Sequence, residues 1–100
     1  MRYSNEYGSW ELTSMPGCTQ TVISHSVFIF PKYRNKGYGQ KNLHERIAQC
    51  KDLGYNYMIC SVATKNEAQI HILKKENFTM LDSFLSSKTN NNVAFYGRIL

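Results

Sequence analysis

The chain has 100 residues, of which 42% are hydrophobic and 13% aromatic, and its formal net charge at neutral pH is +5. This length suits one domain spanning residues 1–100, and the apolar content is too high for a disordered chain. No apolar stretch could span a membrane, no signal peptide is visible, and three scattered cysteines fit free thiols in a reducing cytoplasm, with no metal site.

The first part of the chain predicts two antiparallel strands. Residues 10–15 are expected to form the first strand, and Pro16 and Gly17 the turn that follows it. Residues 18–30 predict a long second strand, polar and β-branched at first and then apolar, with the apolar end buried. Pro31 ends this strand because proline cannot donate a hydrogen bond to a sheet ladder.

A helix is predicted over residues 37–53, and Gly54 is placed to end it in a left-handed conformation. Its apolar residues recur at steps of four, three and three, which makes one stripe along a helix. The members of this stripe are Leu43, Ile47, Cys50 and Leu53.

The second half predicts a strand, a short helix and two more strands. Residues 57–63 form a continuous apolar run, which is typical of a central strand buried on both faces and laid parallel to the strand before it by a right-handed crossover. A helix is expected over residues 67–76, ended by Asn77 in a left-handed conformation. Strands are expected over residues 78–85 and 93–100, with a polar turn over residues 88–92. The predicted order is therefore β-β-α-β-α-β-β.

Between the second strand and the first helix lies a turn that combines glycines with basic side chains. It reads Arg34-Asn35-Lys36-Gly37-Tyr38-Gly39. A strand, a glycine-bearing turn and a helix start point backbone N–H groups and the positive end of a helix dipole at an anion, so a phosphate or pyrophosphate ligand is predicted. The residues after Gly39 are not the Gly-Lys-Ser/Thr of a Walker loop, and Asn42 stands where a dinucleotide fingerprint has its third glycine.

This turn resembles the acyl-CoA site of the GNAT superfamily of N-acyltransferases, whose signature is Arg/Gln-x-x-Gly-x-Gly/Ala after a strand. The resemblance covers residues 22–100. It implies an α+β (α/β) fold with a mixed central sheet in which the two parallel strands splay apart and admit the pantetheine arm of acetyl-CoA. The family's usual N-terminal strand and helices are expected to be lacking, as in a truncated or minimal member, which leaves the acceptor side open or completed by a second subunit in a homodimer.

The resemblance also assigns cofactor-binding residues. Ile29 and Phe30 would offer main-chain groups to the pantetheine. The pyrophosphate would be held, mainly through backbone N–H groups, by Arg34, Asn35, Lys36, Gly37, Tyr38, Gly39 and Gln40. Asn66 matches an asparagine that binds the pantetheine arm, although capping of the second helix explains it equally well.

The catalytic groups are less clearly marked. His25 is the candidate general base that would take the proton of the acceptor ammonium group, and a structural histidine is the alternative. Many family members use a tyrosine to protonate the departing thiolate, and Leu73 stands at that position here. Tyr96 on the last strand is a candidate acid; otherwise water protonates the thiolate, or acyl-CoA is bound without fast transfer.

Three functions are compatible with the sequence. The first is an N-acetyltransferase that passes an acetyl group from acetyl-CoA to an amine, on a protein lysine or N-terminus, by direct attack in a ternary complex. The second is a CoA-binding or protein-binding module without turnover. The third is a basic nucleic-acid-binding module that uses Tyr33, Tyr38 and the lysines around them. Because cofactor phosphates also account for the basic cluster, the third ranks last.

Overall fold

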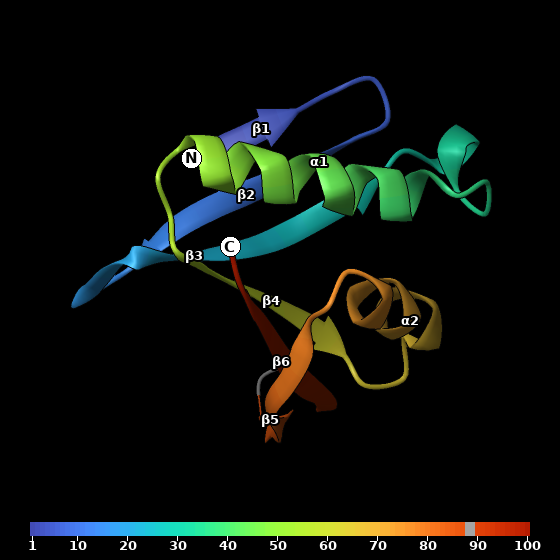
Figure 1. The fold of residues 1–100 in the computed structure, drawn as a ribbon. Coiled ribbons are helices and arrows are strands. Elements are labelled where there is room, and N and C mark those ends of the chain that lie inside the picture. The colour runs from blue at the N-terminus through green and yellow to red at the C-terminus, as the bar shows by residue number, and fades with distance from the viewer. Residues whose placement is uncertain (88–89) are drawn as a thin grey trace.

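A computed structural model describes residues 1–87 and 90–100 of the chain. One mixed six-stranded sheet runs in the order β1-β2-β3-β4-β6-β5 (Figure 1). The elements are β1 (Arg2–Ser4), β2 (Gly8–Met15), β3 (Cys18–Ile29), the 3-10 helix η1 (Pro31–Tyr33), α1 (Tyr38–Asp52), β4 (Tyr57–Ala63), α2 (Glu67–Lys75), β5 (Thr79–Ser86) and β6 (Asn91–Ile99). The predicted α+β order is present from β2 onward, and β1 precedes it as a short additional strand that the sequence analysis missed.

The β2–β3 hairpin forms as predicted. Its turn places Gly17 at a φ of 75°, a conformation that favours glycine because it has no Cβ. β1 adds to the free edge of β2 through three pairs, beginning with Arg2 opposite Glu11. Strands β1, β2 and β3 thus form one antiparallel half of the sheet.

Gly37, whose φ is 82°, is the N-cap of helix α1, and Gly54, whose φ is 90°, follows the C-cap Leu53. The buried residues of α1 are Asn42, Leu43, Arg46, Ile47 and Cys50. The predicted stripe is correct except for Leu53, which is 52% exposed because it lies at the C-cap, past the last helical turn.

Strand β4 alternates between buried and less buried residues. Met58, Cys60 and Val62 belong to the core, together with Leu43 of α1 and Leu73 of α2. Tyr57, Ile59 and Ala63 are only half-buried, and Ser61 is exposed. The prediction of burial on both faces is therefore wrong, because both helices contribute to a core on the same face of this strand.

The parallel strands β3 and β4 separate along their length. They pair from Thr21 opposite Tyr57 to Ser24 opposite Cys60, and the described ladder between them ends there. Beyond that point β3 stays with β2 as far as Ile29, whereas β4 stays with β6 as far as Ala63. Ser26, at a φ of 54°, bends β3 where the separation begins. The predicted splaying of the two parallel strands is confirmed.

The C-terminal part follows the prediction closely. The side chain of Asn66 caps α2 by accepting a hydrogen bond from the Gln69 N–H at 3.2 Å, and Asn77 follows the helix at a φ of 65°. Strands β5 and β6 form an antiparallel hairpin. The predicted polar turn over residues 88–92 is wrong at Asn91 and Asn92, which belong to β6, and its residues 88 and 89 lie outside the described residues.

Candidate functional site

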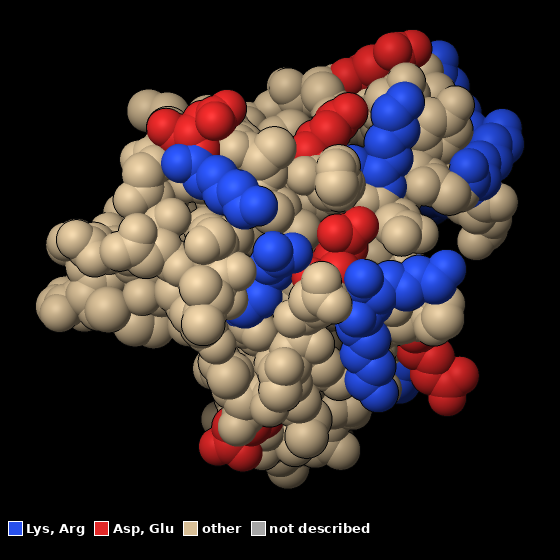
Figure 2. All heavy atoms as spheres, in the orientation of Figure 1, with Lys and Arg blue, Asp and Glu red and all other residues tan. Residues whose placement is uncertain are grey.

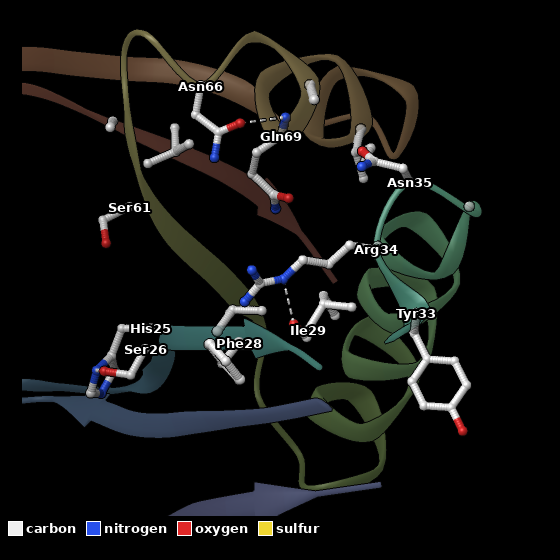
Figure 3. Close-up of a pocket in the computed structure, with 17 residues that line it drawn as sticks. His25, Ser26, Phe28, Ile29, Tyr33, Arg34, Asn35, Ser61, Asn66 and Gln69 are labelled. Carbon is white, nitrogen blue, oxygen red and sulfur yellow. Dashed lines mark hydrogen bonds between the residues drawn. The ribbon is translucent and has the colours of Figure 1, made fainter. Parts of the chain in front are cut away.

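A cleft of about 640 Å³ opens where β3 and β4 separate (Figure 3). One wall is the end of β3 and the loop after it, and the other is the end of β4 and the start of α2. The residues that line it are His25, Ser26, Val27, Phe28, Ile29, Tyr33, Arg34, Asn35, Gly37, Gly39, Ser61, Val62, Ala63, Asn66, Ala68, Gln69 and Ile72. The fork in the sheet is therefore a hollow that a ligand could enter, with the glycine-bearing turn at its rim.

The end of β3 forms an apolar wall that is open to solvent. Val27 is 38% exposed and Phe28 46% exposed, so the prediction that this stretch is buried is wrong. The reason is the departure of β4, which removes the neighbouring strand from this edge. An extended ligand arm could take the place of that strand by pairing with main-chain groups and covering these side chains.

The turn before α1 is built to receive an anion. Asn35 has a φ of 61° and Gly37 a φ of 82°. No side chain caps the N-terminus of α1, and its first turn contains no acidic residue, so the positive end of the helix is uncompensated. A Cβ on Gly39 would come within 3.2 Å of the Ile72 Cδ1 atom, so glycine also keeps this rim of the cleft clear. These features fit the pyrophosphate of a CoA thioester.

Arg34 reaches into the cleft from the turn (Figure 3). Its Nε donates a hydrogen bond to the Ile29 carbonyl at 2.8 Å, and its guanidinium lies 4.8 Å from the centre of the Phe28 ring. This carbonyl is one of the main-chain groups assigned to the pantetheine. A carbonyl oxygen can accept two hydrogen bonds, so a ligand that pairs with the Ile29 carbonyl either shares it with Arg34 or displaces that side chain.

The structure brings only part of the predicted cofactor set to the cleft. Ile29, Arg34, Asn35, Gly37, Gly39 and Asn66 line it. Phe30, Lys36, Tyr38 and Gln40 are not among the lining residues. The Nζ of Lys36 donates to the Lys32 carbonyl at 3.0 Å, which ties the turn to η1. The roles given to these residues in cofactor binding stay predictions.

Three tyrosines brace the turn, and of these Tyr33 also lines the cleft. Tyr7 stacks on Tyr38 with a ring-centre distance of 4.3 Å, and both pack edge-on against Tyr33 at 5.0 and 5.1 Å. The Nζ of Lys41 lies 5.2 Å from the centre of the Tyr7 ring. Because Tyr7 and Tyr38 stack on each other, this packing disfavours their use as a platform for nucleic-acid bases.

Basic side chains surround the start of α1. Figure 2 shows Lys and Arg gathered over the loop at this end of the helix and around α2, with acidic side chains between them. Lys32, Lys36 and Lys41 are all exposed beside the turn. Their charge makes this rim attractive to a ligand that carries several phosphates.

His25 lies at the inner end of the cleft (Figure 3). Its Nε2 is 2.8 Å from the Thr13 hydroxyl, and its Nδ1 is 3.1 Å from the Ser26 hydroxyl and 3.5 Å from a carboxylate oxygen of Glu11. His25 is thus one of the residues that line the cleft, and its ring is held by neighbours on β2 and β3.

Tyr96, the candidate acid, lies in the core and not at the cleft. Tyr96 is 4% exposed within the core cluster and is not among the residues that line the cleft. Leu73 is fully buried. Ser26 and Ser61 bring hydroxyl-bearing side chains to the cleft, whereas the Tyr33 hydroxyl points away from it (Figure 3) and donates to a Glu6 carboxylate oxygen at 3.4 Å. Sequence reasoning missed Ser61, although its position next to Cys60 in an alternating strand places it on the opposite face.

Beneath the fork, Arg46 is buried without a carboxylate partner among the described residues. Its Nε donates to the Asn42 side-chain oxygen and its Nη1 to the Ser24 hydroxyl, each at 2.7 Å. Its Nη2 and the Asn42 Nδ2 have no hydrogen-bond partner within the described part of the chain. Burial lowers the pKa of Arg46, an effect that the nearby Cys60 and Cys50 thiols oppose.

The two core cysteines are expected to be chemically inert. Burial raises the pKa of Cys50 to about 11 and also raises the pKa of Cys60, where Arg46 partly offsets it. Because the thiolate is the reactive form, we expect a thiol reagent at neutral pH to label exposed Cys18 quickly and the other two only on unfolding. Mass spectrometry of the native protein after timed labelling checks this, and fast labelling of Cys50 would contradict it.

The raised pKa values of Cys50 and Cys60 make the free energy of unfolding depend on pH. In the unfolded chain both thiols lose their protons near the ordinary cysteine pKa, whereas in the folded chain they keep them. The free energy of unfolding is therefore expected to be unaffected by these thiols at neutral pH and to fall as the pH rises from about 8.5 toward 11. Urea denaturation at several pH values measures this fall. In a Cys50→Ala variant, the free energy of unfolding is expected to fall less between neutral and alkaline pH than in the wild type.

Two further observations concern the described residues only. Within residues 1–87 and 90–100, no group of three or more His, Cys, Asp or Glu side chains is placed to hold a metal ion. In the same ranges, neither helix combines the length and the apolar character needed to cross a membrane.

The chain is similar in sequence to known acetyltransferases. The sequence model of the acetyltransferase (GNAT) family matches residues 7–78. The chain is 31% identical over 74 residues to the L-amino acid N-acyltransferase MnaT of Escherichia coli (strain K12), and equally to the L-methionine sulfoximine/L-methionine sulfone acetyltransferase of Salmonella typhimurium. These alignments cover 74% of the chain but 41% and 42% of the relatives, so the chain spans less than half the length of these proteins.

Solved structures share the fold at lower identity. An acetyltransferase of Salmonella typhimurium with its cofactor acetyl-CoA gives a TM-score of 0.81 at 22% identity, covering 94% of this chain and 58% of that one. A Bacillus subtilis acetyltransferase in complex with CoA gives a TM-score of 0.78 at 14% identity, covering 98% and 73%. The mixed sheet and its fork are thus features of a known architecture.

Proposed function

The chain belongs to the acetyltransferase (GNAT) family, and from that premise we propose that it transfers an acetyl group from acetyl-CoA to a primary amine. The observation that carries the proposal is the cleft at the β3–β4 fork, with an uncapped helix N-terminus and two glycines at its rim. Arg34, Gly37 and Gly39 would hold the pyrophosphate there. Ile29 would pair with the pantetheine arm, which would share its carbonyl with Arg34 or displace that side chain.

Acetyl-CoA supplies the activated acyl group as a thioester. The chain supplies a place to lay it out and an apolar wall of Val27 and Phe28 that the bound acyl arm would cover. It also supplies His25 as the base that takes a proton from the acceptor ammonium group. Since Tyr96 lies in the core and Leu73 has no hydroxyl, we assign protonation of the departing thiolate to solvent at the open side of the cleft.

The acceptor we propose to test first is the α-amine of a free amino acid. Both curated relatives are named for transfer to amino acids or amino-acid analogues. An amine on a protein is the second candidate, because the exposed walls at Val27 and Phe28 leave the cleft accessible to a large acceptor. A homodimer that completes the acceptor side stays a prediction.

The test measures free thiol released from acetyl-CoA with a panel of amino acids and a panel of peptides bearing an N-terminal amine or a lysine. The proposal expects amine-dependent release that follows saturation kinetics. Substituting His25→Ala is expected to lower kcat/KM by about 10²-fold to 10⁴-fold, the usual contribution of a general base. Tight binding of acetyl-CoA without release for any amine would contradict transfer and favour a binding module.

A further inference from the structure

Glu11, Thr13 and His25 form a group on the face of the β2–β3 hairpin that is turned away from the core. Glu11 is paired with His25 in the strand register, and Leu12 is paired with Ser24. Leu12 and Ser24 are buried, so the alternation of strand side chains sends Glu11, Thr13 and His25 to the opposite face. The group meets the cleft at His25, which is the one of the three that lines it.

The two nitrogens of the His25 ring have different kinds of neighbour. Nδ1 lies 3.5 Å from the Glu11 Oε2 and 3.1 Å from the Ser26 hydroxyl. Nε2 lies 2.8 Å from the Thr13 hydroxyl. An ionised carboxylate can only accept a hydrogen bond, whereas a hydroxyl group can donate or accept. Glu11 is therefore the one neighbour that distinguishes the two nitrogens.

The carboxylate of Glu11 is itself held in place. Its Oε1 lies 3.7 Å from Nη1 of Arg2 on β1, while its other oxygen faces the histidine. Nη2 of Arg2 also donates to the Ser9 hydroxyl at 3.2 Å. Among the described residues, the charged groups facing the ring are thus Glu11 and, behind it, Arg2.

We propose that Glu11 is a positioning residue for His25: it holds the neutral ring in the Nδ1–H tautomer and leaves the Nε2 lone pair as the base. The catalytic part of this inference rests on the proposed function. In this tautomer the Thr13 hydroxyl would donate to Nε2, 2.8 Å away, and because Thr13 is exposed, its hydroxyl can turn to solvent when an acceptor arrives.

One N–H bond of the acceptor ammonium group breaks, and its proton moves to Nε2, directly or through one water molecule. The nitrogen lone pair so released attacks the thioester carbonyl carbon, the new C–N bond forms, and the C–S bond breaks with its electron pair on sulfur. The attached nitrogen then loses its second proton to solvent and becomes the amide, while the thiolate takes a proton from solvent. The imidazolium that forms carries protons on both nitrogens, with Glu11 beside Nδ1 to stabilise its charge.

The first test reads the tautomer and needs no activity. ¹⁵N NMR of the ring, at a pH where its own signals show it to be neutral, is expected to find the proton on Nδ1 in the wild type. In Glu11→Gln the amide can donate as well as accept, so the population is expected to shift toward the Nε2–H form. Glu45→Gln, which removes a carboxylate on α1 that accepts from Asn5 at 2.9 Å, is the matched control and is expected to leave the ring unchanged.

The second test is a double-mutant cycle on acetyl transfer. Glu11→Gln is expected to lower kcat/KM by on the order of 10-fold to 100-fold, as other carboxylate partners of functional histidines do. In a His25→Ala background the same substitution is expected to change kcat/KM by less than about 2-fold, because a positioning residue has nothing left to position. A residue that bound substrate would keep its effect in that background.

The outcomes separate the two proposals. Absence of transfer by the wild type with every amine would contradict the proposed function. With transfer present, an Nε2–H ring in the wild type, or an unchanged kcat/KM in Glu11→Gln, would overturn the role of Glu11 and leave the proposed function standing. Amide spectra of each variant confirm that the hairpin has kept its fold.

Discussion

Gly37→Glu is expected to weaken acetyl-CoA binding by about 100-fold or more, equal to about 3 kcal/mol, because it puts a carboxylate beside the ligand's phosphates. Gly37 caps α1 at a φ of 82°, at the point where the helix directs its N–H groups outward. A Cβ there meets no atom within 4 Å, so the added side chain would extend into the space in front of the helix rather than into the core. Calorimetric titration of wild type and variant measures the change.

Gly17→Glu is the matched control for this substitution. Gly17 has a φ of 75°, and a Cβ there also has no neighbour within 4 Å, so the variant carries the same charge and a similar backbone strain. It lies in the β2–β3 turn, away from the start of α1. We expect Gly17→Glu to bind acetyl-CoA like the wild type. An equal loss in both variants, or an unchanged affinity in Gly37→Glu, would remove the turn from the cofactor site.

Arg46→Ala is expected to lower the free energy of unfolding by about 3 kcal/mol, because it leaves a cavity and strands two buried acceptors. Arg46 is 1% exposed and donates to the Asn42 side-chain oxygen and to the Ser24 hydroxyl. The bond to Ser24 ties the middle of α1 to β3 at the last residue paired with β4, and the bond to Asn42 lies within α1. The loss should therefore loosen the base of the fork as well as the core.

Urea denaturation compares this variant with Arg46→Met and with Lys51→Ala on the exposed side of α1. Methionine refills most of the volume without burying a charge, so it is expected to cost less than alanine. Lys51→Ala is expected to change stability by no more than about 0.5 kcal/mol, as is usual for surface positions. A loss below about 1 kcal/mol in Arg46→Ala would show that the network adds little to stability.

The turn before α1 and the ends of α2 were predictable because each depends on residues that are close together in the sequence. The turn from Arg34 to Gly39 needs positive φ at Gly37 and lies between a strand and a helix, which is enough to predict an anion site. The parallel pairing of β3 and β4 followed from the helix between them. The capping of α2 by Asn66 and the left-handed conformation of Asn77 after it are confirmed for the same reason, since helix ends depend on nearby backbone groups.

The features that were missed depend on contacts between distant residues. Arg46 looks like a surface residue of α1 until Ser24 is placed opposite it. Tyr7 braces the turn only because the β2–β3 hairpin brings it to Tyr33. The exposed end of β3 looked buried because an apolar run does not reveal where its neighbouring strand departs.

The position of the candidate base His25 was predictable, but its hydrogen-bonding partners were not. His25 could be singled out from its place on the strand that leads to the turn. Its partners Glu11 and Thr13 could not, because strand register decides which residues face one another, and a shift of one residue would send Glu11 to the core. Tyr96 failed to reach the cleft for a similar reason: its position on β6 faces the core, beside Cys60 of β4.

The most direct test of acetyl-CoA binding in the fork is a titration followed by backbone amide NMR. We expect the largest shifts in residues 27–29, in Gly37 and Gly39, and in residues 61–63, which together surround the cleft. The Arg34 Nε–H signal should shift with them, because the ligand shares or replaces its bond to the Ile29 carbonyl. Shifts confined to the β5–β6 hairpin, or no shifts in a folded protein at saturating acetyl-CoA, would contradict the account.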